Sequence, residues 1–205
     1  MNNVISTILF STVILYSIGA YVNMDSTDKQ TAPIPVAIQE LDHMENIKAT
    51  NETEKKETLV KYDLPDDDTY FKTYMSYKAI TNTRSAQYKL QQDAWTDENG
   101  LRRIGDDYMI AVGTFYSSTV GERFKITLAN GFEFYATVGD IKADKHTDSM
   151  NMYTPVYSNG KVISANVIEF IVDTPSLPKK VRQLGTVSGI EDFEGNILTM
   201  EKVKE

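Results

Sequence analysis

The stretch RFKITLANGFEFYATV, residues 123–138, decides the fold. Two runs of alternating apolar and polar residues flank Asn130-Gly131, a dipeptide typical of the tight turn of a β-hairpin. Such alternation buries one face of each strand and exposes the other. The stretch therefore predicts two antiparallel strands joined by a short turn.

Further strand-like runs lie on both sides of this hairpin. A second hairpin is expected at residues 95–104, around Asp97-Glu98-Asn99-Gly100. Residues 84–92 are open to two interpretations, a short helix or an extended arm, and residues 179–184 suit one or two helical turns. Single strands are expected at residues 70–77, 108–112, 166–173 and 196–203. Six or seven short strands with tight turns and little helix predict an all-β barrel or sandwich.

The chain begins with an uncharged apolar run, Val4–Val22. Its length matches the roughly 20 residues that cross a bilayer as a helix. A cleaved signal peptide is the alternative, and small residues near Ala20 would suit its cleavage site. No Lys or Arg precedes the run, which favours an uncleaved anchor. We expect residues 1–22 to place the chain at the cell membrane as a single-pass protein, with its folded part outside the cytoplasm.

Residues 23–68 differ from the rest in charge. They hold 12 acidic and 5 basic side chains, whereas residues 69–205 hold 17 and 16. The part from Asn46 to Thr58 is too polar to bury a core. We therefore predict a flexible acidic linker at 23–68 and a folded domain at 69–205.

Composition excludes several classes of function. The 205 residues include no cysteine, so disulfide scaffolds and thiolate metal sites are excluded. The net charge is −8, and the folded part lacks the basic footprint of nucleic-acid binding. No phosphate-binding glycine loop or nucleophile elbow is present. We expect no nucleic-acid partner and no cofactor.

The stretch after the first hairpin, GDIKADKHTDSMNMY at residues 139–153, gathers the groups most capable of chemistry. Asp140, Asp144 and Asp148 recur every four residues. One interpretation is acid/base catalysis by a desolvated carboxyl group. A second is a metal site at Asp144, His146 and Asp148, although the spacing fails the calcium-loop pattern and we predict no metal. A third is that these side chains satisfy the backbone of a long loop.

The same residues resemble a known group of proteins. Residues 108–113, 121–128, 139–148 and 166–173 look like uncharacterised proteins of Firmicutes and their phages. More distantly, this part of the chain is similar to the three-aspartate (3D) domain of membrane-bound lytic transglycosylase A. The resemblance covers about residues 71–187. It implies a small six-stranded double-psi β-barrel that cleaves the glycan strands of peptidoglycan through an aspartate acid/base.

The match to the 3D pattern is partial. Asp140 fits its first aspartate and Tyr153 its tyrosine, but Asn151 stands where the proposed acid/base belongs. Asp148 could take that role if the loop is rearranged. The resemblance thus implies Asp140, Asp148 and Asp144 as catalytic candidates. Substrate-binding candidates are Lys142, His146, Asn151 and Tyr153.

Two functions follow from these observations. One is a membrane-anchored cell-wall enzyme of the lytic transglycosylase type. The other is a non-catalytic module of a phage or mobile element at the cell envelope, which either binds wall glycan or an envelope protein or serves in assembly through protein contacts of its barrel. Catalysis by transglycosylation would need only one carboxylic acid, because the sugar's own hydroxyl attacks.

Overall fold

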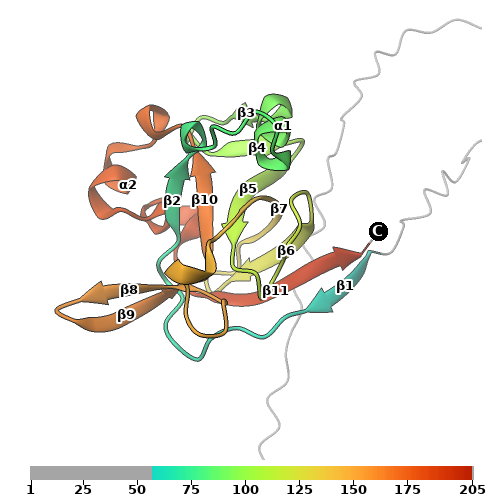
Figure 1. The fold of residues 1–205 in the computed structure, drawn as a ribbon. Helices are drawn as coiled ribbons and strands as arrows, with labels where there is room; N and C mark the ends of the chain where they lie inside the picture. The colour runs from blue at the N-terminus through green and yellow to red at the C-terminus, as the bar shows by residue number, and fades with distance from the viewer. Residues whose placement is uncertain (1–56, 205) are drawn as a thin grey trace, which may run out of the picture. The chain divides into compact units, whose positions relative to one another are not determined.

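A computed structural model describes residues 57–204, and these form a mostly β structure with two short helices (Figure 1). The predicted all-β class is confirmed for this part of the chain. The helices are α1 (Ala86–Asp93) and α2 (Lys179–Leu184), with 3-10 turns at η1 (Tyr77–Ala79), η2 (Asp144–His146), η3 (Thr174–Ser176), η4 (Val187–Gly189) and η5 (Glu191–Phe193). The strands are β1 (Thr58–Lys61), β2 (Thr73–Ser76), β3 (Trp95–Thr96), β4 (Arg102–Ile104), β5 (Asp107–Val112), β6 (Arg123–Leu128), β7 (Glu133–Ile141), β8 (Thr154–Ser158), β9 (Lys161–Asn166), β10 (Ile168–Val172) and β11 (Ile197–Lys204).

The main sheet is open. Its hydrogen-bonded order is β1-β11-β6-β7-β5-β10-β2, with β3 and β4 attached beside β5. The pairs β5–β7 and β2–β10 are parallel, and the other pairs are antiparallel. β1 and β2, the two ends of this order, are four-residue strands that do not pair with each other. The six-stranded closed barrel expected from the resemblance is therefore not formed by the described residues.

The hairpin at residues 123–138 forms as predicted. Phe124 pairs with Ala136 and Ile126 with Phe134, so these apolar side chains share one face of β6 and β7. The Asn130 side chain accepts a hydrogen bond from the Phe132 N–H and supports the turn. The sequence pattern thus set both the strands and their register.

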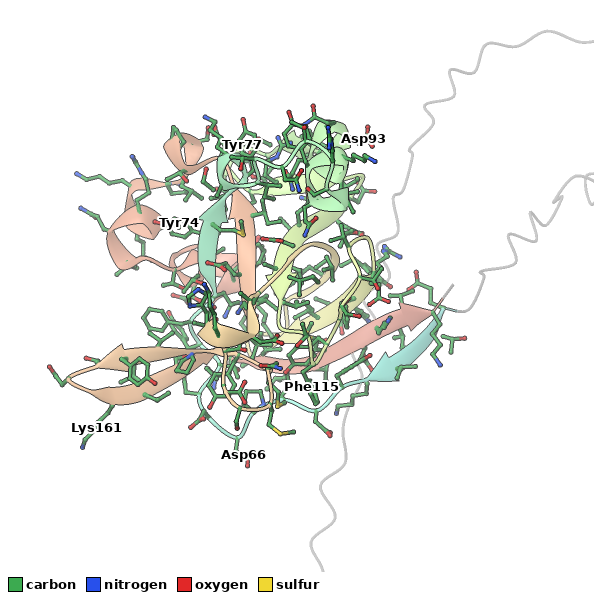
Figure 2. The ribbon with its side chains drawn as sticks, in the orientation of Figure 1. Asp66, Tyr74, Tyr77, Asp93, Phe115 and Lys161 are labelled. Atoms are coloured by element: carbon green, nitrogen blue, oxygen red, sulfur yellow. The ribbon has the colours of Figure 1, made fainter. Side chains whose placement is uncertain are left out.

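Residues 84–92, which the sequence left open, contain the helix α1. Ser85 caps its N-terminus by accepting a hydrogen bond from the Tyr88 N–H. Sequence reasoning missed one hairpin, β8–β9, which turns at Asn159-Gly160 with both residues at positive φ. In Figure 2 this hairpin extends away from the main sheet, with Lys161 near its tip.

The predicted linker boundary at residue 68 is wrong. Thr58–Lys61 forms β1 and pairs with β11, and the Tyr62 ring packs against the core. The polar composition of this segment gave no sign of strand β1, because an edge strand needs only backbone pairing and a few apolar contacts. The folded part therefore includes residues 57–68.

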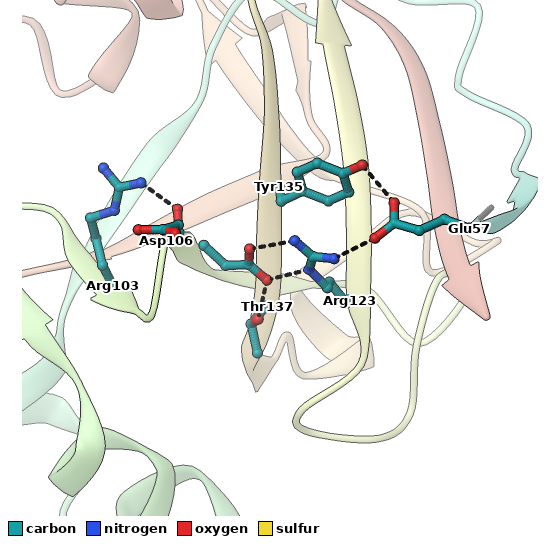
Figure 3. Close-up of polar contacts among 7 residues, drawn as sticks. Glu57, Arg103, Asp106, Arg123, Tyr135 and Thr137 are labelled. Atoms are coloured by element: carbon teal, nitrogen blue, oxygen red, sulfur yellow. Dashed lines mark hydrogen bonds and ion pairs between the residues drawn. The ribbon is translucent and has the colours of Figure 1, made fainter. Parts of the chain in front are cut away.

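A polar network fixes the start of this part (Figure 3). Arg123 donates two hydrogen bonds to the Asp107 carboxylate, at 2.7 and 3.0 Å, and a third to Glu57 at 2.8 Å. Asp107 also accepts from Thr137, and the Tyr135 hydroxyl donates to Glu57. The bidentate pair links β5 to β6 across the intervening strand β7, and Glu57 ties the chain before β1 to the same cluster.

The main sheet buries one face in an aromatic-rich core. Phe134, Phe170 and Phe193 meet edge-on or tilted, with ring centroids 4.9–6.0 Å apart. Helix α1 lies over part of the opposite face, where Gln91 lies against Met109. Another part of that face lines a groove.

Residues 1–56 lie outside the described part of the chain, and so do the predicted anchor at 4–22 and most of the predicted linker. Within residues 57–204, no helix has the length and apolar character needed to span a bilayer.

Candidate functional site

A β-bulge in β7 decides where Asp140 points. Up to Val138, alternate residues of β7 face the core. The register with β5 then shifts, because Val138 pairs with Ile110 but Asp140 pairs with the next residue, Ala111. Ile141 consequently takes the core side. The bulge thus turns Asp140 to the second face of the sheet, where strict alternation would have buried it.

The absence of a side chain at Gly139 allows this bulge, because neighbouring side chains lie very close to its backbone. A Cβ at this position would lie 2.6 Å from the Ile171 Cδ1 atom and 3.0 Å from the Met109 Cε atom. Both side chains are fully buried under α1. The missing side chain therefore lets β7 pass closely over its neighbours just before Asp140.

Four cross-strand partners form a row on this second face. Asp140 of β7 lies opposite Ala111 of β5, Ala111 opposite Glu169 of β10, and Glu169 opposite Thr73 of β2. Residues aligned in this way across adjacent strands have side chains on the same side of the sheet. The row places two carboxylates on one surface with a small alanine between them.

This row forms the floor of a groove of about 660 Å³. One wall is β8 from Thr154 to Tyr157, and another is the turn that contains Ala143 and His146. Tyr157 is 65% exposed and stands at the open side of the groove. The volume falls within the range of small-molecule and oligomer-binding clefts.

Asp140 is partly desolvated in this groove. Burial raises the pKa of Asp140, although hydrogen bonds from the Ile141 N–H and the Gln87 side chain work in the opposite direction. The Gln87 Nε2 atom of α1 lies 3.4 Å from the Asp140 Oδ1 atom, a long hydrogen bond. A carboxyl group with a raised pKa is suited to donate a proton near neutral pH.

Lys142 directly follows the end of β7 and is almost completely buried. Its ammonium donates to the Asn166 backbone carbonyl. Burial lowers the pKa of Lys142 to about 8, and the negative charge of Glu169 opposes this effect. Thr73 connects the same network, because its hydroxyl donates to Glu169 at 3.4 Å and accepts from the Asn166 side chain at 2.7 Å.

Asp148 has a different role. Its carboxylate accepts hydrogen bonds from the backbone N–H groups of Met150, Met152 and Tyr153, at 2.6–3.0 Å. Burial tends to raise the pKa of Asp148, but these bonds outweigh it and lower the pKa. Asp148 thus organises the loop between η2 and β8, as the third interpretation of the segment expected.

Asp144 does not line the groove. It begins η2, is exposed, and accepts a hydrogen bond from the Thr114 hydroxyl at 2.8 Å. Its neighbour in the turn, His146, lines the groove and is exposed to solvent. The three aspartates therefore do not converge, because only Asp140 lies in the groove.

Asn151 and Tyr153 also lie outside the groove. Asn151 adopts a left-handed backbone with φ of 57°, which asparagine tolerates better than most residues. Its carbonyl oxygen approaches Gly113 so closely that a Cβ there would lie 2.0 Å away. The Tyr153 hydroxyl donates to Asp67 at 3.0 Å. Both residues serve the packing of the loop.

Sequence reasoning missed Glu169. Residues 166–173 were predicted to form a buried strand, and Glu169 within it was not considered as part of a site. The signal was nevertheless present: alternation places Glu169 on the face opposite Ile168 and Phe170, which are fully buried in the core. Only the strand order brings this face beside Asp140.

A second hollow, of about 1030 Å³, lies near Glu57, Arg123 and Lys202. Its charges are already paired, since Arg123 binds Glu57 and Lys202 binds Glu122. It therefore offers less unused chemistry than the groove at Asp140. No cluster of three or more His, Asp or Glu side chains in residues 57–204 is arranged to hold a metal ion.

Comparisons with protein-family models, with curated proteins and with solved structures find no match to this chain.

Proposed function

We propose that this protein binds a glycan strand in the groove at Asp140 and cleaves it, with Asp140 as the general acid. One observation carries the proposal: the bulge in β7 turns a single partly desolvated carboxyl group into an open groove. The other two aspartates of the segment are engaged elsewhere. The proposal does not require a closed double-psi barrel, because the groove lies on one face of an open sheet.

The chemistry of the groove suits a sugar chain. Cleavage of a glycosidic bond needs a proton for the leaving oxygen, and a carboxyl group of raised pKa supplies it. The groove also presents hydroxyl, imidazole and carboxylate groups that can hydrogen-bond to sugar hydroxyls, from Thr73, Thr154, His146 and Glu169. Tyr157 offers an exposed ring on which a pyranose could stack.

The proposed substrate is cell-wall glycan. An anchor at residues 4–22 would hold the groove at the outer surface of the membrane, and the linker would let it reach the wall. This location rests on the sequence prediction, and the resemblance to the 3D domain points to the same substrate class.

The test uses the full 205-residue chain, purified in mild detergent, with insoluble peptidoglycan as substrate. Released fragments are identified by mass spectrometry. We expect the wild type to release fragments and Asp140→Asn to lose at least about 100-fold in rate. Asp106→Asn is the matched control, because Asp106 is an exposed aspartate in the β4–β5 turn. Equal activity of Asp140→Asn and the wild type would refute the proposed role.

The raised pKa of Asp140 predicts a pH dependence as well. The general acid must be protonated, so the rate should fall as pH rises through the pKa of Asp140 in the complex. A rate that increases over this range would contradict the assignment.

The second candidate is binding of the same glycan without cleavage. The engagement of Lys142 with the Asn166 carbonyl favours it, because it leaves fewer free groups for catalysis. This candidate predicts that the wild type and Asp140→Asn both sediment with insoluble peptidoglycan while neither releases fragments.

A further inference from the structure

We propose that Glu169 is the catalytic base that activates a water molecule, so that the groove hydrolyses its glycan with inversion instead of forming an anhydro-sugar. This inference rests on the proposed function of Asp140 and adds the nucleophile and the type of product. It depends on the cross-strand row, which the sequence alone did not reveal.

The row sets the spacing of the two backbone positions that carry the carboxyl groups. Asp140 and Glu169 stand two strands apart, with Ala111 of β5 between them. Neighbouring strands lie about 4.8 Å apart, so the two backbone positions are separated by roughly 9–10 Å. Inverting glycosidases place their carboxyl groups about 6.5–9.5 Å apart, whereas retaining enzymes need about 5 Å. Two side chains projecting from this row suit the wider class.

Space for the reaction lies in the groove that both residues line, whose volume is about 660 Å³. Ala111 between them is buried and has only a methyl group, so no long side chain of β5 stands in the groove at this point. In the proposed complex the sugar and the water molecule occupy this groove. A lytic transglycosylase has no need of a second carboxylate at this distance, since its nucleophile belongs to the substrate.

The surroundings of the two groups differ in the way that the mechanism requires. Burial raises the pKa of Asp140. Glu169 accepts a hydrogen bond from the Thr73 hydroxyl and attracts the Lys142 ammonium, whose pKa it raises against the effect of burial. Desolvation favours the protonated form of Asp140, whereas Glu169 has a hydroxyl donor and a nearby ammonium group around it.

The proposed step is balanced. Asp140 donates its proton to the glycosidic oxygen as the bond from that oxygen to the anomeric carbon breaks. Glu169 takes a proton from water, and the water oxygen forms a new bond to the anomeric carbon from the opposite side. The products are two hydroxyl-ended glycans, Asp140 is left ionised and Glu169 protonated, and exchange with solvent restores both.

The products distinguish the two mechanisms. We expect fragments released by the full-length chain in ¹⁸O-labelled water to carry one solvent oxygen at a reducing end. Fragments with an unlabelled anhydro end would overturn the assignment of Glu169 while leaving the role of Asp140 intact. Release of no fragments by the wild type would instead refute the proposed cleavage, and this inference with it.

Substitution at Glu169 gives an independent test. Glu169→Gln should lower kcat at least about 100-fold, whereas Glu98→Gln, at an exposed turn position, should not. Glu169→Ala should regain activity with azide and yield a glycosyl azide of inverted configuration, because azide needs no base. An unfolded variant could not be rescued in this way, so rescue supports the assignment. If Glu169→Ala has the wild-type unfolding midpoint and azide does not restore it, the assignment is refuted.

Discussion

The contact between Gly113 and Asn151 makes a sharp prediction about stability. Gly113 follows β5 directly, and a Cβ there would lie 2.0 Å from the Asn151 carbonyl oxygen and 2.9 Å from its carbonyl carbon. Atoms of this kind do not approach closer than about 3.0 Å, so Gly113→Ala forces a movement of about 1 Å. The obstacle is backbone, and no change of rotamer can relieve it.

The expected cost follows from what must move. Overpacking costs about 1–3 kcal/mol when side chains can adjust, and more when they cannot. Displacing Asn151 also disturbs the Phe115 N–H bond to its carbonyl and the buried Met152 beside it. We therefore expect Gly113→Ala to lower the free energy of unfolding by about 3 kcal/mol or more.

Urea denaturation followed by far-ultraviolet circular dichroism measures this effect. With a slope of about 2 kcal/mol per molar urea, the midpoint should fall by roughly 1.5 M. The matched control is Gly189→Ala, where the nearest atom to the new Cβ would be the flexible Leu184 Cδ1 at 3.3 Å and the next ones would lie at an ordinary contact distance of 3.6 Å. If the two variants unfold within about 0.5 kcal/mol of each other, the close approach of Gly113 to the loop is wrong.

Three further predictions concern buried charges and the loop. The pKa of Lys72 and that of Lys142 are both lowered by burial to about 8, so the unfolded chain binds more protons above this pH. The free energy of unfolding of the wild type should rise by a few kcal/mol from pH 8 to 10, and the rise should be smaller in Lys142→Met. A fall in the free energy of unfolding of both proteins over this range would contradict the burial of these lysines. Asp148→Asn should cost about 2 kcal/mol at pH 7, and progressively less as pH falls through the lowered pKa of Asp148, where the wild type itself becomes protonated; equal losses at neutral and strongly acidic pH would show that the charge is unimportant. Asn151→Ala should cost about 1 kcal/mol and Asn151→Gly much less, since Asn151 has positive φ, and Asn151→Asp should not increase glycan cleavage because the residue lies outside the groove. Thermal unfolding and fragment release test these statements, and increased cleavage by Asn151→Asp would refute this account of the loop.

The sequence predicted local structure well where one strand pair controls it. In residues 123–138, alternation and the Asn130-Gly131 turn determined both strands and their register. The same reasoning failed for β1, because an edge strand has too few buried side chains to leave a pattern. It also failed for β8–β9, whose exposed Tyr157, Val162 and Ile163 do not alternate cleanly.

The segment 139–153 shows how far the sequence alone can identify functional residues. Its composition drew attention to Asp140, Lys142 and His146, and the structure places these three residues along one groove. It could not separate these from Asp144 and Asp148, because equal spacing along the chain says nothing about which side chain a loop turns inward. Asp144 and Asp148 are held by hydrogen bonds to Thr114 and to the loop backbone, respectively, and so do not line the groove.

The sequence by itself determined the all-β class, the central hairpin and the neighbourhood of the site, because these depend on residues close together in the chain. Tertiary structure alone decided that β7 carries a bulge, that the sheet stays open, and that Glu169 stands two strands from Asp140. Strand order and register arise from the packing of distant segments. A period-2 pattern can show which face a residue takes, but it cannot show which strand will lie beside it.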